Sequence, residues 1–390
     1  MSKWEMVRLG DVCEVITKGT TPTTLGYRFQ DEGINFLKVE SIEQNGNFLF
    51  DKIEHISKEC DEKLKRSRLK EHDLVFSIAG ALGRTAIVTK AILPANLNQA
   101  LSVIRLHKDQ AFHRYIQYVL KSVCVFQQFQ KQKQGVAQLN LSLKNISDLV
   151  IPLPPFEVQK QIAQTLDVAS ELTALHNKQL AELDKLIKST FYDMFGDPVA
   201  NEKGWGVKKL GEVGELARGI SKHRPRNDPK LLNGAYPLIQ TGDVANAGLY
   251  INNYKQTYSE IGLQQSKIWN KGTLCITIAA NIAKTSILNF SACFPDSIVG
   301  FKPNESTNVF YINVWFSFFQ KIIEEQAPES AQKNINLKIL NDLDIVIPPI
   351  ALQNQFAEIV TKIEEQKALV KKAIDESQYL FDSLMSEYFE

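Results

Sequence analysis

The stretch LPPFEVQKQIA, residues 153–163, has a counterpart 194 residues later in IPPIALQNQFA, residues 347–357. Both contain a pair of prolines, a glutamine four residues after the second proline, and the ending Gln-x-Ala. Proline is favoured in the first turn of a helix, where its missing N–H leaves no hydrogen bond unmade. The two stretches therefore predict the starts of two related helices, near Pro155 and near Pro349.

Both predicted helices are long. Neither glycine nor proline interrupts residues 156–195, and Gly196 and Pro198 then provide a stop signal. The second helix runs on from Pro349 to the last residue without such an interruption. At about 1.5 Å per residue, a helix of this length reaches roughly 60 Å, which is longer than one mixed domain can cover.

Each helix carries mainly apolar side chains at alternating spacings of four and three residues, which is typical of the seam of a coiled coil. The first seam consists of Ile162, Leu166, Ala169, Thr173, His176, Leu180, Leu183, Ile187, Thr190 and Met194. The second consists of Leu352, Phe356, Ile359, Ile363, Gln366, Val370, Ala373, Ser377, Leu380 and Leu384. We expect the two seams to face each other. The alternative is that each helix packs only on the domain beside it.

The repetition extends over the rest of the chain. WEMVRLGDV at residues 4–12 matches WGVKKLGEV at 205–213, DLVFSIA at 73–79 matches TLCITIA at 273–279, and AQLNLSLK at 137–144 matches AQKNINLK at 331–338. With the helix starts, four blocks occur twice in the same order, which indicates an internal duplication. The offset between the copies drifts from block to block, so insertions and deletions are expected in the loops.

We therefore predict an α+β fold in which two similar mixed α/β domains are separated by two long antiparallel helices that form a coiled coil, with a pseudo-two-fold internal repeat. The expected parts are a first mixed domain at 1–154, a first helix at 155–197, a second mixed domain at 198–348 and a second helix at 349–390. Residues 74–78 and 274–278 are predicted strands, because they are short and rich in β-branched or aromatic side chains. A helix is also expected from Phe112 to Gln134, ended by Gly135.

Composition narrows the class of protein. The 390 residues carry a formal net charge of +1 and are 44% hydrophobic, which is ordinary for a globular chain. There is no signal-peptide pattern at the N-terminus and no apolar run of about 18 residues, so neither secretion nor a membrane span is expected. The five cysteines are scattered without a CxxC pair, which predicts neither a zinc site nor a disulfide framework and suits the cytoplasm.

We find no catalytic signature. The sequence Leu153-Pro154-Pro155-Phe156 lacks the polar residue that precedes the prolines in the related motif of amino-methyltransferases. The glycines of residues 80–85 lack the spacing of a phosphate-binding loop. The six histidines show neither HxH nor HExxH spacing, so no catalytic residue, metal or cofactor site is predicted.

Two segments suit a polyanion. No acidic residue lies between Asp109 and Asp148, a segment that carries several glutamines and the basic residues Arg114, Lys121, Lys131, Lys133 and Lys144. The second copy contains a basic loop with Arg218, Lys222, His223, Arg224, Arg226 and Lys230. Lysine and arginine neutralise phosphates, whereas glutamine and asparagine can pair with base edges. The basic residues between Lys63 and Lys70 are mixed with acidic ones, and we interpret them as a solvated helix face.

The duplicated Trp…Leu-Gly-Asp/Glu-Val opening, the Lys-Gly-Thr-Thr-Pro turn at residues 18–22 and the paired helix starts resemble the specificity subunits of type I restriction–modification systems. Residues 191–198, Phe-Tyr-Asp-Met-Phe-Gly-Asp-Pro, are similar to the end of that family's central helical region. The resemblance covers essentially the whole chain.

The resemblance implies a non-catalytic DNA-binding subunit. Each mixed domain would be a target recognition domain that reads one half of a bipartite sequence in double-stranded DNA, and the helices would set the spacing. Two methyltransferase subunits would dock on the helices and carry S-adenosylmethionine, and restriction subunits with translocase and nuclease activity would join them. The alternatives are a coiled-coil scaffold that binds no DNA and a self-sufficient adenine methyltransferase.

Within that resemblance, the expected DNA contacts are the residues matched between the two copies, together with Lys131, Lys133 and Arg226 from the two basic segments. In the first domain these are Lys18, Thr20, Thr21, Lys38, Glu40, Ser41, Arg84, Lys131, Lys133, Gln138 and Asn140. In the second domain they are Arg218, Lys222, Arg224, Arg226, Gln240, Thr241, Asp243, Lys284, Gln332 and Asn334.

Overall fold

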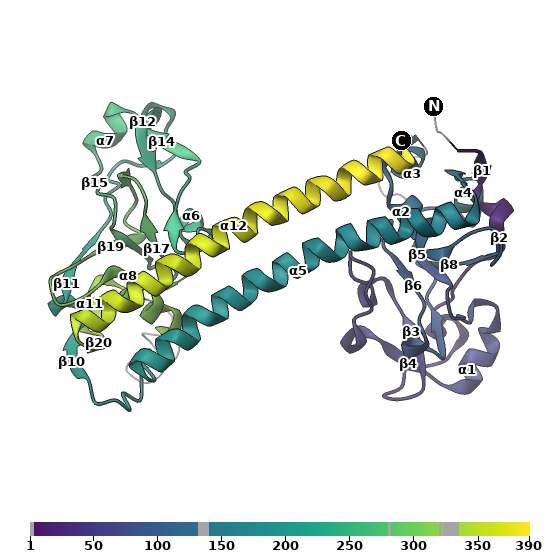
Figure 1. Ribbon diagram of the computed structural model, residues 1–390, viewed down its shortest axis with the longest axis horizontal. Helices are drawn as coiled ribbons and strands as arrows, with labels where there is room; N and C mark the ends of the chain where they lie inside the picture. Colours follow the sequence, from purple (N-terminus) through teal and green to yellow (C-terminus); the bar gives the residue numbers. More distant parts are fainter. Residues whose placement is uncertain (1–3, 132–139, 280–281, 320–321, 323–334) are drawn as a thin grey trace. The chain divides into compact units, whose positions relative to one another are not determined.

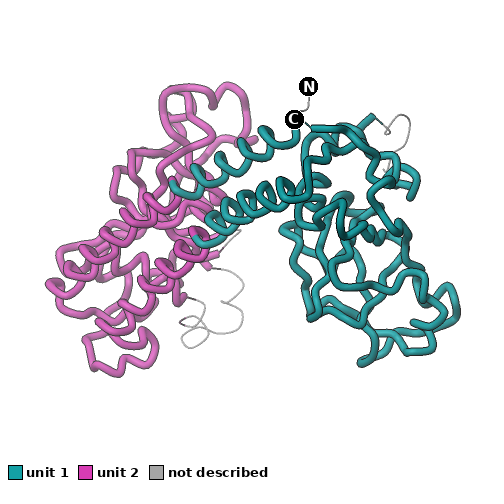
Figure 2. The backbone as a smooth tube through the Cα atoms, turned by 45° about the vertical axis from the view of Figure 1, so that its right-hand side comes forward, with its two compact units in different colours: residues 1–175, 373–390 teal, residues 176–372 magenta. Residues whose placement is uncertain are grey.

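The computed structural model describes residues 4–131, 140–279, 282–319, 322 and 335–390. The chain divides into two compact units (Figure 2): unit 1 comprises residues 1–175 and 373–390, and unit 2 comprises residues 176–372. The boundary between the units cuts both long helices. Each unit therefore contains one mixed domain and half of each long helix.

Unit 1 has two sheets and a separate strand pair (Figure 1). One sheet has the strand order β2-β8-β5-β6, the other has the order β4-β3-β7, and β1 pairs with β9. In chain order the elements are β1 (Met6–Arg8), β2 (Cys13–Lys18), β3 (Ile34–Leu37), β4 (Glu54–Ile56), α1 (Lys58–Lys63), β5 (Leu74–Ser77), β6 (Thr85–Ile87), β7 (Ala95–Leu97), β8 (Leu101–Leu106), α2 (His113–Lys121), α3 (Val123–Lys131), α4 (Leu143–Ser147) and β9 (Val150–Pro152).

Unit 2 repeats this plan. Its sheets have the orders β11-β19-β16-β17-β13 and β14-β12-β18-β15, and β10 pairs with β20. The elements are β10 (Gly206–Lys209), β11 (Gly214–Arg218), β12 (Leu232–Leu238), α6 (Thr241–Asn246), β13 (Tyr250–Ile251), β14 (Gln256–Tyr258), α7 (Glu260–Gln264), β15 (Ile268–Trp269), β16 (Leu274–Thr277), β17 (Thr285–Leu288), β18 (Ala292–Cys293), β19 (Ile298–Pro303), α8 (Val309–Trp315), α11 (Leu337–Asp342) and β20 (Asp344–Ile347).

The predicted strands are the buried centres of the larger sheets. Every residue of β5 and of β16 is buried, which explains their continuous apolar character. Their registers also correspond, because Ser77 pairs with Leu101 at the start of β8 and Thr277 pairs with Ile298 at the start of β19. The duplication read from the sequence is therefore a duplication of sheet topology.

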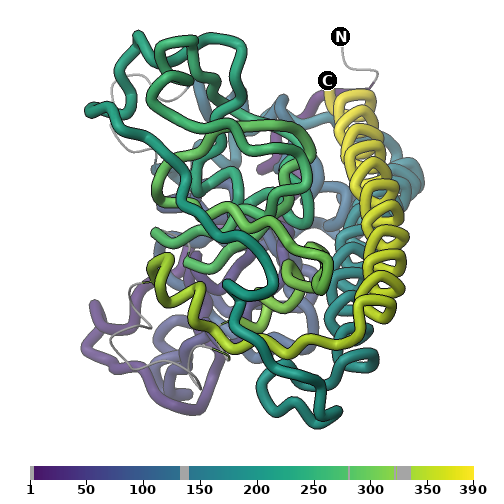
Figure 3. The backbone as a smooth tube through the Cα atoms, turned by 90° about the vertical axis from the view of Figure 1, so that its left-hand side faces the viewer, coloured from purple at the N-terminus to yellow at the C-terminus, as the bar shows by residue number. Residues whose placement is uncertain are grey.

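The two long helices begin and end where the sequence predicts. α5 (Phe156–Phe195) and α12 (Ile350–Phe389) each start directly after the second proline of their Pro-Pro pair. Gly196 follows α5 with φ +81°, the left-handed conformation that ends many helices and that glycine adopts without strain. Within unit 1 the last turns of α12 lie beside the first turns of α5, so the two segments run antiparallel (Figures 1 and 3).

The predicted seam is right for α5 and for seven of the ten positions in α12. All ten predicted positions in α5 are buried or half-buried. In α12, Phe356, Ile363, Val370 and Ser377 are buried and Leu352, Ala373 and Leu384 are half-buried, as expected, but the other three positions are shifted by one residue. The prediction is wrong at Ile359, Gln366 and Leu380, which are exposed, whereas Val360, Lys367 and Phe381 are buried or half-buried in their place.

The end of each helix closes the core of a mixed domain. In unit 1, Phe389 packs on Tyr115 of α2 with ring centroids 5.6 Å apart. In unit 2, Phe195 packs on Tyr311 of α8 at 4.9 Å. Both tyrosine hydroxyls donate to a strand carbonyl at the equivalent place, Pro152 in unit 1 and Val346 in unit 2.

A buried glutamine joins the start of each helix to its mixed domain. The Gln159 side-chain amide accepts from the Phe112 backbone N–H at 2.8 Å and donates to the carbonyls of Gln110 and Pro154. Gln353 accepts from the Asn308 N–H at 2.9 Å and likewise donates to two carbonyls. The matched glutamines are thus structural residues rather than base-reading ones.

The single helix expected from Phe112 onward is wrong. The chain forms α2 and α3, and Ser122 between them is extended, with φ −70° and ψ 155°. Its hydroxyl donates to the Val119 carbonyl and accepts from the Val125 N–H, so it serves both helix ends. Serine competes with the helical backbone for hydrogen bonds in this way, and periodicity alone does not reveal it.

Candidate nucleic-acid interface

Two equivalent turns carry seven of the twenty-one predicted DNA contacts: Lys18, Thr20 and Thr21 in unit 1, and Arg218, Lys222, Arg224 and Arg226 in unit 2. One follows β2 and the other follows β11, and each begins at a glycine that lies directly against a neighbouring segment. A Cβ on Gly19 would lie 1.7 Å from the Leu97 carbonyl oxygen, and one on Gly219 would lie 2.3 Å from the Phe294 carbonyl oxygen. Glycine is therefore required at both positions, and it brings each turn onto the residues that precede β8 or β19.

The turn in unit 1 presents hydroxyl groups. Lys18 is exposed, and Thr20 and Thr21 are half-exposed. The Thr21 hydroxyl donates to the side-chain carbonyl of Gln99, and the Thr24 hydroxyl donates to the Thr21 backbone carbonyl at 2.6 Å. The turn is therefore ordered by short hydrogen bonds, and no acidic side chain takes part in them.

The turn in unit 2 presents guanidinium groups. Arg224 and Arg226 both form ion pairs with the Asp296 carboxylate, Arg224 at 3.5 Å and Arg226 at closer range. The Arg218 Nε donates to the backbone carbonyl of Asp296 at 3.1 Å. Three arginines of the predicted set thus converge on one residue, while Lys222 is exposed nearby.

Asp228 and Gln265 order the remainder of the unit 2 turn. The Asp228 carboxylate accepts from the Lys230 N–H at 3.0 Å and lies 3.2 Å from the His223 Nε2. The hydrogen bond from the Lys230 backbone is the main reason that the pKa of Asp228 is lowered. The Gln265 side chain accepts from the His223 N–H at 3.0 Å. This basic turn therefore has a defined conformation.

A second pair of matched turns has mainly structural roles. Ser41 is fully buried, and its hydroxyl accepts from the Lys38 N–H at 2.8 Å. The half-buried Asp243 accepts from the Gln240 N–H at 2.9 Å in the same way. The structure thus does not place Ser41 on an accessible surface, because it serves to cap its turn. Lys38 contacts Glu54, whereas Glu40 and Gln240 are exposed and Thr241 is half-exposed.

The two matched basic residues before β6 and β17 have different surroundings. The Arg84 guanidinium donates to the backbone carbonyls of Val39 (3.3 Å) and Ile42 (2.9 Å), so it holds a neighbouring turn. Lys284 is exposed. Sequence matching alone did not distinguish an anchoring arginine from an exposed lysine.

The acid-free segment is only partly described. Lys131 and Asn140 are exposed. Lys133, Gln138, Gln332 and Asn334 lie outside the described residues. Arg114 forms an ion pair with Asp167 of α5 at 2.5 Å, which is an internal role. The expectation of one solvated helix face from Lys63 to Lys70 is wrong, because α1 ends at Lys63 and Leu69 is buried.

Sequence reasoning missed Gln99 and Asp296. Gln99 lies two residues before β8 and contacts the turn after β2, and Asp296 lies two residues before β19 and contacts the turn after β11. Their signal was weak, because a glutamine and an aspartate at equivalent places do not look like a match. Only the shared sheet register identifies them as counterparts.

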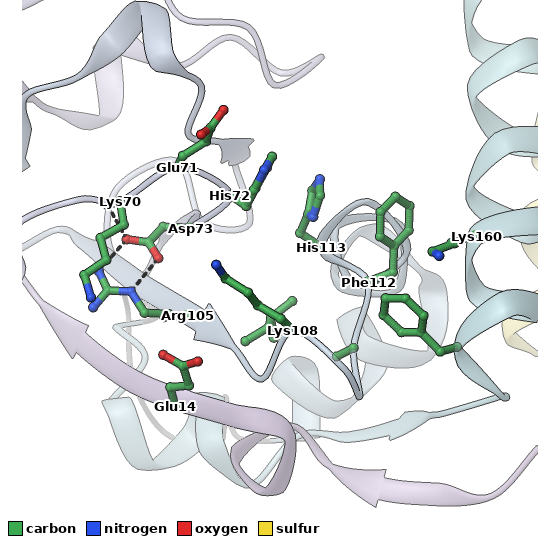
Figure 4. Close-up of a pocket in the computed structure, with 13 residues that line it drawn as sticks. Glu14, Lys70, Glu71, His72, Asp73, Arg105, Lys108, Phe112, His113 and Lys160 are labelled. Carbon is green, nitrogen blue, oxygen red and sulfur yellow. Dashed lines mark hydrogen bonds and ion pairs between the residues drawn. The ribbon is translucent and has the colours of Figure 1, made fainter.

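A pocket of about 710 Å³ lies elsewhere in unit 1. Figure 4 shows His72 and His113 side by side at its centre, with ring centroids 4.5 Å apart, and the Asp73–Arg105 ion pair at one side. The predicted DNA contacts do not line it. Burial is the main reason that the pKa of His113 is lowered to about 4.

The histidine pair of this pocket has no counterpart at the equivalent positions of unit 2. The residue two before β16 is Gly272, where unit 1 has His72 two before β5, and both have positive φ. Val309 occupies the place of His113, two residues before the matched tyrosine. The histidine pair is therefore an individual feature of unit 1, separate from the duplicated turns.

Comparison with known proteins agrees with the duplicated architecture. A family model described as "Type I restriction modification DNA specificity domain" matches the chain over residues 1–185 and 202–377. The putative type I restriction enzyme MjaX specificity subunit of Methanocaldococcus jannaschii is 26% identical over 396 residues, which cover 96% of this chain and 87% of that protein. The type I restriction enzyme EcoBI specificity subunit of Escherichia coli is 28% identical over 170 residues, 42% of this chain and 35% of that protein.

Solved structures show the same fold. One is described as "Structural basis underlying complex assembly and conformational transition of the type I R-M system"; it has a TM-score of 0.63 and 19% identity, over 99% of this chain and 97% of that one. The type I restriction–modification system S subunit from M. genitalium has a TM-score of 0.56 and 15% identity, over 100% and 96% of the two chains. At such identities the likeness concerns the fold alone.

The chain is thus a duplicated α+β protein with a DNA specificity domain in each half. It belongs to the family of type I restriction–modification specificity subunits. Members of this family are non-catalytic, and DNA sequence specificity and assembly with the other subunits of the system are implied by membership. No helix among the described residues is both long and apolar enough to cross a lipid bilayer.

Proposed function

We propose that this chain is the sequence-specific DNA-binding subunit of a type I restriction–modification complex and that each mixed domain reads one half of a bipartite target. The observation that carries this proposal is the pair of equivalent turns after β2 and β11. They follow equivalent strands and open with equivalent glycines, yet one presents threonine hydroxyls around Thr21 and the other presents arginines around Arg224. Equivalent positions with different side-chain chemistry are what two different half-sites require.

The chemistry of each turn suits DNA in a different way. Arginine binds phosphate oxygens and can pair with guanine through two hydrogen bonds, and lysine neutralises phosphates. Hydroxyl groups both donate and accept, so the unit 1 turn can contact phosphate or several base edges. We therefore expect the half-site read by unit 2 to depend more strongly on salt than the half-site read by unit 1.

The long helices are proposed to set the half-site spacing and to dock two methyltransferase subunits. Supporting this, unit 1 has an apolar groove of about 380 Å³ between α5 and α12, lined mainly by Val168, Ala169, Leu172, Leu380 and Leu384. Val168, Leu172 and Leu380 in this lining are 62%, 39% and 47% exposed, and a contiguous patch of exposed apolar side chains is typical of an interaction surface. A partner helix would cover this groove.

The chemistry of the complex is assigned to the partners. Binding of S-adenosylmethionine and adenine methylation belong to the methyltransferase subunits in this proposal, and translocation and cleavage belong to the restriction subunits. The chain itself is proposed to need no cofactor or metal and to work in the cytoplasm. Its five cysteines are all unpaired, which fits a reducing compartment.

The proposal is tested in the complex assembled with its methyltransferase subunits. The preferred site is first selected from a pool of random duplexes, and its affinity is then measured from 50 to 200 mM salt. Arg224→Ala with Arg226→Ala should lower the affinity and reduce the slope of log K against log salt by about one unit for each lost phosphate contact.

A matched control removes two charges elsewhere in unit 2. Lys208 and Lys271 are exposed, and Lys271 lies in the turn before β16, at the opposite end of that strand from the arginine turn. Lys208→Ala with Lys271→Ala should leave affinity and slope close to wild type. Selection that yields no enriched sequence, or identical salt slopes for both double variants, would overturn the proposal.

A further inference from the structure

We call the turns after β2 and β11 the recognition turns. One residue contacts each recognition turn from the same place in the duplicated sheet. Gln99 lies two residues before β8 and Asp296 two residues before β19. The glycine that opens each turn approaches the backbone of the same segment, at Leu97 in unit 1 and at Phe294 in unit 2. The two residues therefore belong to one structural position, which we call the support position.

In unit 2 the residue at the support position contacts three arginines of the recognition turn. The Asp296 carboxylate contacts Arg224 and Arg226, and the Asp296 carbonyl accepts from Arg218. The carboxylate is partly exposed, at 38%, as are both guanidiniums. Exposed ion pairs add little to the stability of a fold, so stability does not explain this arrangement well.

In unit 1 the support position organises a hydroxyl. The Gln99 side-chain carbonyl accepts from Thr21, which directs that hydroxyl proton toward Gln99 and leaves the lone pairs of the hydroxyl oxygen available to accept from DNA. Gln99 is itself exposed, so its NH₂ group is on the same surface. In unit 1 an uncharged residue at the support position contacts a hydroxyl group, whereas in unit 2 a charged residue at that position contacts guanidinium groups.

We propose that the support position, Gln99 in unit 1 and Asp296 in unit 2, is a positioning residue that sets which DNA group each recognition turn can engage. Asp296 holds two flexible arginines in one orientation before DNA arrives, which reduces the side-chain entropy lost on binding. Gln99 likewise fixes the direction of the Thr21 hydroxyl before DNA binds. This inference rests on the proposed function of the two turns.

A positioning role for Asp296 and a simple effect of its charge predict opposite changes in the affinity for the selected DNA site, which makes the proposal testable. Asp296→Asn removes a negative charge, so general attraction to any DNA should stay equal or rise. The same change releases Arg224 and Arg226, so binding to the selected site should weaken. Loss of folding would lower both kinds of binding together, and a purely repulsive carboxylate would raise both when removed.

The measurement uses the full chain assembled with its methyltransferase subunits. Two probes are compared: the duplex selected by the wild-type complex, and a duplex of the same length and composition with scrambled sequence. We expect Asp296→Asn to lower affinity for the selected duplex by roughly tenfold and to leave affinity for the scrambled duplex the same or higher. Asp342→Asn, at the exposed last residue of α11, is the control for net charge and should leave the ratio of the two affinities unchanged.

A double-mutant cycle tests whether Asp296 acts through the arginines. In a background of Arg224→Ala with Arg226→Ala, Asp296→Asn should have no further effect on the affinity ratio. For unit 1, Gln99→Met keeps the length of the side chain but removes the acceptor. Renewed sequence selection with this variant should relax the preference at one half-site only, and the other half-site should stay as in wild type.

The outcomes separate this inference from the proposed function. If the arginine variants weaken DNA binding but Asp296→Asn leaves the affinity ratio unchanged, the positioning role of Asp296 is overturned and the proposed function stands. If Gln99→Met changes both half-sites or neither, the unit 1 part of the inference is overturned. If the arginine variants have no effect at all, it is the proposed role of the turn that fails.

Discussion

The turns after β2 and β11 leave equivalent strands at equivalent glycines, yet they present opposite kinds of side chain. The unit 1 turn is ordered by uncharged hydrogen bonds around Thr21, and the unit 2 turn by ion pairs to Asp296. By contrast, the contacts that close each core are nearly the same, as Gln159 and Gln353 show. Duplication has thus kept the scaffold constant, because packing and buried hydrogen bonds tolerate little change, while the exposed turns have diverged.

The largest expected effect tests the packing of α12 in unit 2. Ile363 is buried, and Ile363→Asp places a charge in an apolar contact, so it should lower the free energy of unfolding by about 3–5 kcal/mol. Ile359, one turn earlier, is 38% exposed, and Ile359→Asp should lower it by less than about 1 kcal/mol. Urea unfolding followed by circular dichroism measures both. Equal losses would mean that the phase of the α12 seam is not the one described.

The helix ends should show a slightly unequal pair of effects. Phe195→Ala removes a ring packed against Tyr311 and Phe356, and it should destabilise unit 2 by about 3–4 kcal/mol. Phe389→Ala removes the matched ring on Tyr115, but Phe389 contacts fewer aromatic rings and at longer centroid distances, 5.6 Å to Tyr115 and 6.5 Å to Tyr388, so about 2–3 kcal/mol is expected. Differential scanning calorimetry can compare the two variants. A larger loss for Phe389→Ala would contradict this difference in packing.

The buried glutamines should behave alike in the two units. Gln159→Leu and Gln353→Leu each leave a backbone N–H and two carbonyls without their partner, which should cost about 2–3 kcal/mol in each case. Gln161→Leu and Gln355→Leu alter exposed glutamines two residues further on and serve as controls. Thermal unfolding of the four variants checks the match. A difference above about 1 kcal/mol between the two buried sites would show that the units are less alike than their hydrogen bonds indicate.

The smallest expected effect is a pH dependence confined to unit 1. Burial holds the pKa of His113 in the folded chain at about 4, below the ordinary value of 6.5. As the pH falls through 6.5 the unfolded chain takes up a proton on this residue and the folded chain does not, so stability is lost between pH 6.5 and about 4. Because His113 is only half-buried, the loss from pH 7.5 to pH 5 should be about 1 kcal/mol.

The matched residue in unit 2 supplies the control for this effect. His113→Val introduces the side chain that Val309 has at the equivalent place. The variant should lose less stability than wild type between pH 7.5 and pH 5, as measured by urea unfolding at each pH. If the two proteins show the same pH dependence, His113 does not titrate as described.

The sequence by itself determined the duplication, the starts and ends of both long helices, and the seam of α5. These features are local or periodic: a Pro-Pro pair starts each helix, Gly196 ends one, and the apolar spacing repeats along the chain. The contrast between an arginine-rich loop and a hydroxyl-rich turn was also visible, because composition alone carries it.

Only the tertiary structure decided which residues occupy three of the α12 seam positions and what roles the individual polar residues have. Lys367 takes a seam position because Asp184 and Glu364 accept its ammonium group at 2.7 and 2.5 Å, and a sequence pattern counts lysine as exposed. Arg84 became an anchor, and Gln99 and Asp296 became supports, through contacts with residues distant in the chain. Periodicity records which face of an element is apolar, whereas the partner of a polar side chain depends on which segments folding brings together.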